Sequence, residues 1–167
     1  MGELFDKLAN YGNSGIYPFH MPGHKRQKTV DFNPYKIDIT EIEGFDNLHH
    51  AEGVLLEAQK KAEKLYGSEE SHFLINGSTA GILSAVSACA KKTVLIARNC
   101  HKAVYHAALI RNLDVYYVYP EIQEEFMLNG GINPADVERS LEEHPEIEAV
   151  VITSPTYDGI VSDVKRI

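Results

Sequence analysis

Apolar runs typical of strands alternate with stretches of helical periodicity in the second half of the chain. The runs span residues 93–97, 114–119 and 147–153. Between them, the spacing of apolar residues predicts a helix over 102–111 and another that starts at Asn133-Pro134 and ends near residue 143. This alternation is typical of βα units with a largely parallel sheet that is covered by helices on both faces.

A similar pattern lies just before this region. A short apolar run of strand type, residues 72–75, ends at the turn signal Asn76-Gly77. A helical pattern follows, with apolar residues at Ile82, Leu83, Val86 and Ala90. We therefore predict a strand, a tight glycine turn and a helix.

The predicted turn has the chemistry of an anion site. Backbone N–H groups at the start of a helix point to one spot, with the positive end of the helix dipole behind them. The hydroxyls of Ser78 and Thr79 add donors. The alternative is plain N-capping, since Ser and Thr also cap helices that bind nothing, and this segment alone leaves both interpretations open.

The first half of the chain is less regular. Leu4, Phe5 and Leu8 predict a short amphipathic helix, and a second helix is predicted from Glu52 to Tyr66, with Gly67 as its C-terminal cap. The apolar stripe of the second helix comprises Val54, Leu55, Ala58, Ala62 and Leu65.

Two irregular segments separate these helices. Residues 18–25, Pro-Phe-His-Met-Pro-Gly-His-Lys, form either an arm packed on a partner subunit or an active-site arm with His20, His24 and Lys25 near a substrate. Residues 38–49 carry four carboxylates and are followed by His50. Their spacing fits no metal template, so we favour a solvated acidic loop over a metal site.

Composition narrows the class of protein. The 167 residues, 44% of them hydrophobic, suffice for one domain with a core. The formal net charge of −8 argues against nucleic acid and anionic membrane surfaces as partners. No apolar run has the length of a membrane span, and the N-terminus lacks the features of a signal peptide. We expect a cytoplasmic protein whose two cysteines, Cys89 and Cys100, are reduced and buried.

In parallel sheets, ligands bind at the carboxyl ends of the strands. Three loops leave predicted strands there, over residues 76–79, 98–101 and 154–157, and we expect them to converge. We discount a Rossmann-type nucleotide site because the turn after Ile75 lacks the G-x-G-x-x-G pattern.

Five blocks, in order, resemble the major domain of the ornithine/lysine/arginine decarboxylase family. They are residues 18–25, the block 38–49, Phe-Leu-Ile-Asn-Gly-Ser-Thr at 73–79, Arg-Asn-Cys-His at 98–101 and Thr-Ser-Pro-Thr-Tyr at 153–157. Members use pyridoxal 5′-phosphate (PLP) and have the aspartate-aminotransferase fold. The resemblance implies a three-layer α/β sandwich, with an N-terminal arm over residues 1–50 and the first part of the PLP-binding major domain over 51–167.

The resemblance also implies roles for individual residues. Gly77, Ser78 and Thr79 would hold the cofactor phosphate, and the His101 imidazole would stack on the pyridine ring. Ser154 and Thr156 would lie near the cofactor's phenolic oxygen or the substrate carboxylate, or serve only as turn residues beside Pro155.

Two residues that such enzymes need lie further along the family's sequence: the Schiff-base lysine and the aspartate that pairs with the pyridinium nitrogen. Neither Lys25 nor Lys102 is assigned to the first role. We therefore expect an N-terminal piece of a longer enzyme, inactive by itself, with no metal.

The expected function is decarboxylation of lysine, arginine or ornithine, which releases carbon dioxide and a polyamine-type amine. The expected assembly is a homodimer or larger homo-oligomer, with residues 18–25 and 38–49 near the interface. Another enzyme of the same fold, such as an aminotransferase or a lyase, and a non-catalytic assembly module remain alternatives.

Overall fold

The computed structural model describes residues 3–19, 24–27 and 31–167. The prediction for His20 lies outside these residues. The chain divides into two units, Met1–Glu69 and Glu70–Ile167, which are described separately. The expected domain boundary after residue 50 stays a prediction.

The first unit contains the two helices that the sequence predicts. They are α1 (Glu3–Gly12) and α2 (Val54–Tyr66), and a 3-10 turn (Pro34–Lys36) lies between them. Gly67 ends α2 in the left-handed conformation, with φ of 66°, and its N–H bonds to the Glu63 carbonyl. The expected stripe of α2 is only partly covered, because Val54 and Leu65 are exposed.

Most of the acidic loop at residues 38–49 is exposed, as expected, but one of its carboxylates caps α2. Asp46 accepts hydrogen bonds from the backbone N–H groups of Glu52 at 3.0 Å, Gly53 at 2.7 Å and Leu55 at 3.0 Å. These bonds to the charged form hold the pKa of Asp46 well below its usual value. The helix therefore receives its cap from a residue several positions outside it.

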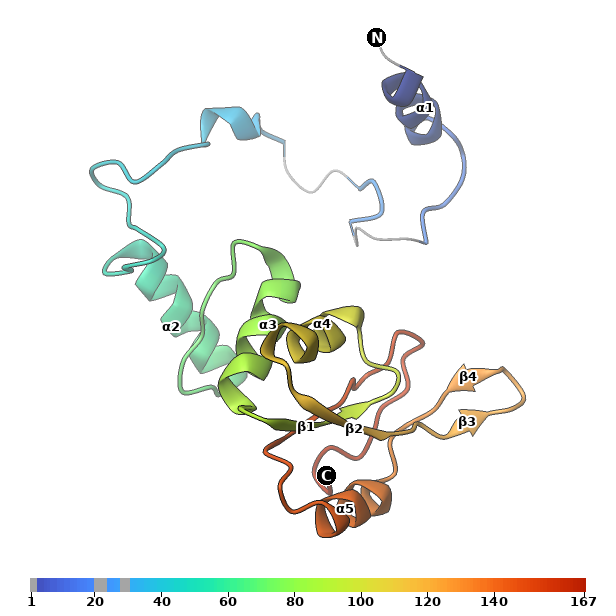
Figure 1. The fold of residues 1–167 in the computed structure, drawn as a ribbon. Coiled ribbons are helices and arrows are strands. Elements are labelled where there is room, and N and C mark those ends of the chain that lie inside the picture. Colours follow the sequence, from blue (N-terminus) through green and yellow to red (C-terminus); the bar gives the residue numbers. More distant parts are fainter. Residues whose placement is uncertain (1–2, 20–23, 28–30) are drawn as a thin grey trace. The chain divides into compact units, whose positions relative to one another are not determined.

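The second unit is built around a parallel sheet (Figure 1). Its elements in chain order are α3 (Gly77–Cys89), β1 (Thr93–Ala97), α4 (Lys102–Arg111), β2 (Asp114–Val118), β3 (Ile122–Gln123), β4 (Leu128–Asn129), α5 (Pro134–Glu143) and β5 (Ala149–Val151). The strand order is β2-β1-β5, with both pairs parallel. The predicted parallel βα arrangement is confirmed.

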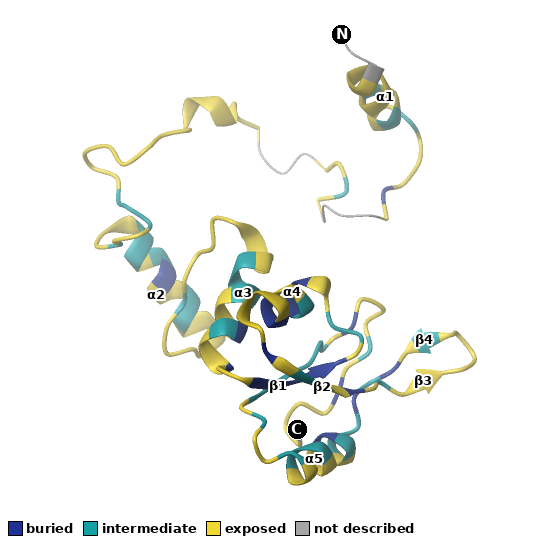
Figure 2. Ribbon diagram, in the orientation of Figure 1, coloured by how far each residue is buried: buried dark blue, intermediate teal, exposed yellow. Residues whose placement is uncertain are grey.

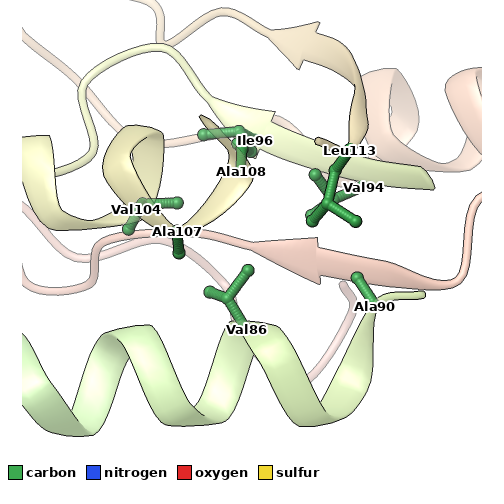
Figure 3. Packing of buried hydrophobic residues seen from close by; sticks show 8 residues of the cluster. All are labelled: Val86, Ala90, Val94, Ile96, Val104, Ala107, Ala108 and Leu113. Atoms are coloured by element: carbon green, nitrogen blue, oxygen red, sulfur yellow. The ribbon is translucent and has the colours of Figure 1, made fainter. Parts of the chain in front are cut away.

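The central strand β1 is buried on both faces (Figure 2). Val94 and Ile96 pack in one cluster with residues of α3 and α4, and Figure 3 shows this packing around Val86 and Val104. Leu95 and Ala97 point to the opposite face, where Val137 of α5 packs. Side chains alternate along a strand, so one strand joins both layers, and this unit has three layers, helix, sheet and helix.

The predicted strand at residues 72–75 is wrong. The segment is irregular, and Phe73, Leu74 and Ile75 are exposed. No strand of the described chain pairs with it, and an apolar run without a neighbouring ladder has no reason to form a strand. Leu74 packs instead against Gly81 of α3, so closely that a methyl group at Gly81 would lie 2.5 Å from a Leu74 methyl carbon.

Three smaller expectations also change. The loop expected at 120–133 contains the β3–β4 hairpin, which closes through Gly130 N–H to the Glu121 carbonyl at 2.6 Å. The strand expected over 147–153 is shorter, because β5 spans only Ala149–Val151. Of the two cysteines expected to be buried, Cys89 at the end of α3 is exposed, and Cys100 is half-buried.

Candidate functional site

The loop after β1, residues 98–101, is tied to both neighbouring strands. Arg98 N–H donates to the Val118 carbonyl at 2.8 Å and so extends the β1–β2 ladder by one residue. The Cys100 thiol contacts the Val151 carbonyl and the Thr153 hydroxyl, each at 3.5 Å, at the end of β5. The structure thus brings together the loops that follow β1 and β5, as the sequence predicts for the carboxyl edge of a parallel sheet.

Burial raises the pKa of the Cys100 thiol. The thiol is therefore held in its protonated form, which is a poor nucleophile. Cys100 links the two loops and is not a candidate for covalent chemistry.

His101 caps α4 with its side chain. Its Nδ1 accepts a hydrogen bond from the Ala103 N–H at 3.1 Å. A ring nitrogen that accepts carries no proton, so a neutral His101 carries its proton on Nε2. The same bond fixes the ring relative to the start of α4, and the side chain is exposed.

The N-terminus of α3 differs from those of α4 and α5. His101 and Asn133 cap the latter two helices through their side chains, but Asn76 makes no such bond at α3. Gly77 is left-handed, with φ of 69°, a conformation that glycine adopts without strain. The hydroxyls of Ser78 and Thr79 are exposed and make no hydrogen bond within the described chain. First-turn N–H groups lack partners inside a helix, so the turn offers several free donors.

A cavity of about 570 Å³ lies beside these elements. Its lining combines one face of α3, the start of α4 and strand β5: Ile82, Val86, Val104 and Val151, with His101, Glu148 and Thr153 as polar members. Ile82 follows Thr79 by less than one helical turn. The cavity therefore connects the α3 helix to His101, although no hydrogen bond in the described chain joins Ser78 or Thr79 to the other loops.

Ser154 and Thr156 stabilise their own loop. The Ser154 hydroxyl oxygen accepts from the Ser162 N–H at 3.0 Å, and that of Thr156 accepts from the Ile160 N–H at 3.1 Å. Thr156 is buried. Both residues therefore act as turn residues, which was one of the two roles that the sequence left open. A ligand role for either hydroxyl stays a prediction.

The other residues named from the sequence make local contacts. His24 Nδ1 accepts from the Arg26 N–H at 3.0 Å, and Lys25 Nζ donates to the Phe19 carbonyl at 3.3 Å. Lys102 is the first residue of α4 and is exposed, and its place outside the site stays a prediction. Within the described ranges, no group of three or more His, Cys, Asp or Glu side chains could hold a metal, and no helix is long and apolar enough to cross a membrane.

Sequence reasoning missed a cluster formed by Arg98, Tyr105 and Tyr117. The Arg98 guanidinium carbon lies 5.3 Å from the centre of the Tyr105 ring and 5.5 Å from that of Tyr117. Tyr105 lies on α4, four residues after His101, so its closeness to the loop could have been predicted. Tyr117 lies on strand β2, and only the fold brings it to Arg98. It also missed Asn99, whose buried Oδ1 has no hydrogen-bond partner in the described chain.

Comparison with known proteins places the chain in a family. Residues 3–167 match the family described as "Orn/Lys/Arg decarboxylase, major domain". The chain is 36% identical to the protein YaaO of Bacillus subtilis, described as uncharacterized, over 98% of this chain and 36% of that protein. It is 31% identical to an arginine decarboxylase of Bacillus cereus, over 98% of this chain and 38% of that enzyme.

A solved structure shows the same fold. The constitutive lysine decarboxylase of Escherichia coli superposes with a TM-score of 0.64 at 26% identity, over 95% of this chain and 26% of that one. The chain spans about a third of the length of the curated relatives that it matches first. The match over residues 3–167 and the shared parallel α/β architecture show that this chain belongs to the Orn/Lys/Arg decarboxylase family, to whose major domain it corresponds.

Proposed function

We propose that this chain supplies phosphate-binding and ring-contacting elements of a PLP-dependent decarboxylase that acts on lysine, arginine or ornithine. Two relatives are named arginine decarboxylase and inducible lysine decarboxylase, which supports a basic amino acid as substrate. The observation that carries the proposal is the N-terminus of α3, which has no side-chain cap and presents two hydroxyls that bond to no described residue.

The donors at this turn fit a phosphate group. A phosphate offers oxygens that accept several hydrogen bonds, and helix N-termini favour anions through their dipole. Gly77 allows the backbone to turn closely around such a group, and Ser78 and Thr79 would each donate one further bond. Helices α4 and α5 offer no comparable turn, since His101 and Asn133 already use their first N–H groups.

His101 fits a flat ring as its neighbour. The hydrogen bond from Ala103 holds the imidazole in one orientation and leaves its face uncovered by that bond. PLP, when bound, supplies an electron sink for the electron pair left as carbon dioxide departs. In this proposal His101 limits the tilt of the cofactor ring, and its available donor is Nε2–H, because Nδ1 already accepts from Ala103. Ser154 and Thr156 are proposed to face the cofactor or the substrate carboxylate with their hydroxyl hydrogens.

We further propose the PLP-dependent transferase sandwich as the complete fold, and a homodimer or larger homo-oligomer as the assembly. The arm at residues 18–25 and the loop at 38–49 are proposed to lie near the subunit interface. Exposed apolar residues in the first unit support this, among them Phe19, Ile39 and Phe45. A cytoplasmic location and inactivity of the 167-residue chain by itself stay predictions.

The test uses the complete enzyme and the double variant Ser78→Ala/Thr79→Ala. Loss of two hydrogen bonds to a charged group is expected to weaken PLP binding by about 1–3 kcal/mol. Ser84→Ala, on the same helix and also exposed, is the matched control and should bind PLP as the wild type does. Equal PLP affinity in all three proteins would refute the phosphate site.

The reaction is tested by product analysis with lysine, arginine and ornithine. Release of carbon dioxide from one of them supports a decarboxylase. Formation of a keto acid instead would show an aminotransferase, and a colourless protein without PLP absorbance would favour a non-catalytic module.

A further inference from the structure

One side-chain hydroxyl joins the loop at residues 98–101 to helix α4. The Tyr105 hydroxyl donates to the Arg98 carbonyl at 2.7 Å and accepts from the Arg98 guanidinium at 2.9 Å. Arg98 is therefore held to α4 through both its backbone and its side chain. Its N–H is bound at the same time to the Val118 carbonyl of β2, at 2.8 Å.

Aromatic rings complete the cluster. The rings of Tyr105 and Tyr117 stack with their centres 6.3 Å apart and an angle of 29° between their planes. The Arg98 guanidinium lies within cation–π distance of both. The Tyr117 hydroxyl makes no hydrogen bond to any described residue, whereas the Tyr105 hydroxyl makes two.

These contacts bridge the two ends of the segment that contains His101. Arg98 precedes His101 by three residues, and Tyr105 follows it by four, so the hydroxyl bridge closes a short loop of chain of which His101 is a member. Within this bridged segment, the cap bond from the Ala103 N–H fixes the imidazole relative to the start of α4. A functional side chain keeps one position only when neighbouring residues restrain it. Here the bridge restrains the backbone on both sides of His101.

We propose that Arg98 and Tyr105 form a clasp that positions His101 for contact with the cofactor ring. Both are positioning residues and touch no reacting atom. The clasp rests on the function proposed above for His101, but its effect on the loop exists without the cofactor. It is therefore testable in two separate ways.

The first measurement is made on the complete protein without cofactor. Tyr105→Phe removes the bridging hydroxyl and keeps the ring, and Tyr117→Phe is the matched control. Amide hydrogen exchange of Cys100 and Ala103 should become about 3–10-fold faster in Tyr105→Phe, because local opening exposes these groups more often. Tyr117→Phe should exchange like the wild type. If Cys100 and Ala103 exchange no faster in Tyr105→Phe than in Tyr117→Phe, the clasp does not exist.

The second measurement asks whether the clasp positions His101. At saturating PLP, the visible circular dichroism of the bound cofactor reports its asymmetric surroundings. Tyr105→Phe should shift this band toward that of His101→Asn and raise the PLP dissociation constant about 3–10-fold, while Tyr117→Phe leaves both unchanged. Faster exchange with an unchanged band and dissociation constant would overturn the positioning role.

The two proposals fail in different ways. If neither His101→Asn nor Ser78→Ala/Thr79→Ala alters PLP binding, the proposed function of the site fails and the positioning role fails with it. If those variants weaken binding and Tyr105→Phe does not, only the positioning role of the clasp is wrong. Arg98→Lys provides a second variant: it keeps the charge, cannot reproduce the guanidinium geometry, and should resemble Tyr105→Phe.

Discussion

At the scale of single residues, His101 combines two roles that substitutions can separate. Its Nδ1 caps α4, and its ring is the proposed neighbour of the cofactor. Asparagine is a good N-cap but has no ring, whereas phenylalanine has a ring but no acceptor. A simple alanine variant would remove both roles at once.

We expect His101→Asn to retain the stability of the protein and to weaken PLP binding by about 0.5–1.5 kcal/mol, the range for one aromatic contact. His101→Phe should keep most of the binding and lower the free energy of unfolding by about 0.5–2 kcal/mol, the cost of a lost cap. Chemical denaturation and PLP titration measure the two effects. The same loss of stability in both variants would show that the cap contributes nothing.

Asp46 gives a residue-scale prediction about pH. Its folded-state pKa is depressed from the ordinary value of 3.8, so its stabilisation is fully present above that value and is lost as the pH falls below it. Asp46→Asn should therefore lower the melting temperature by a constant amount from about pH 7 to about pH 5, and by less at lower pH. Asp38→Asn, an exposed carboxylate in the same loop, should have little effect. A difference in melting temperature between wild type and Asp46→Asn that grows as the pH falls would contradict this.

At the scale of elements, the helices that pack on the sheet of the second unit begin where local signals in the sequence predict them. Helix α5 begins as predicted, with Asn133 accepting from the Ala135 N–H at 3.0 Å and Pro134 as the first helical residue. Glu148 then connects elements: its carboxylate accepts from the N–H groups of Lys91 and Lys92 at 2.6 and 2.7 Å. These bonds lower the pKa of Glu148 and tie the start of β5 to the turn before β1.

The β3–β4 hairpin provides an element-scale prediction. A methyl group at Gly130 would lie 2.9 Å from the Glu121 carbonyl oxygen, whereas one at Gly131 would meet nothing closer than 3.5 Å. Gly130→Ala should lower the free energy of unfolding by about 1–3 kcal/mol through overpacking against backbone. Gly131→Ala, the neighbouring control, should be nearly neutral. Denaturant titration of both variants tests this, and equal values would show that the hairpin shifts without cost.

At the scale of the whole molecule, burial is distributed unevenly between the two units. Leu95, Ile96 and Ala97 of β1 are fully buried. Among the described residues of the first unit, only Pro18 and Gln59 are buried. Because burial of apolar surface is the main favourable term in folding, the second unit contains most of the stability of the chain.

Limited proteolysis of the 167-residue chain should therefore cut first before Glu70. Segments that bury little open at low free-energy cost, whereas the strands of a packed sheet open only on global unfolding. The fragment that contains residues 93–118 should persist longest, as mass spectrometry would show. Early cuts within β1 or α4 would contradict the burial that the structure shows.

Local sequence signals determined much of the second unit. The strand β1, the helix α4 and the start of α5 occur where the apolar pattern and the Asn133-Pro134 signal predict them. These predictions hold because each element's periodicity and caps lie within a few neighbouring residues. The resemblance to the decarboxylase family was also visible in the sequence, because short motifs in a fixed order can be identified without knowing which residues are in contact.

Only the tertiary structure decided the rest. Residues 72–75 have the composition of a strand, but a strand requires a hydrogen-bonded neighbour, which no local pattern supplies. The cap of α2 by Asp46 and the bridge from Tyr105 to Arg98 join residues that are separated along the chain. Such contacts depend on the path of the chain in three dimensions. The apolar pattern therefore determined the helices and strands, and tertiary packing determined which polar groups form hydrogen bonds.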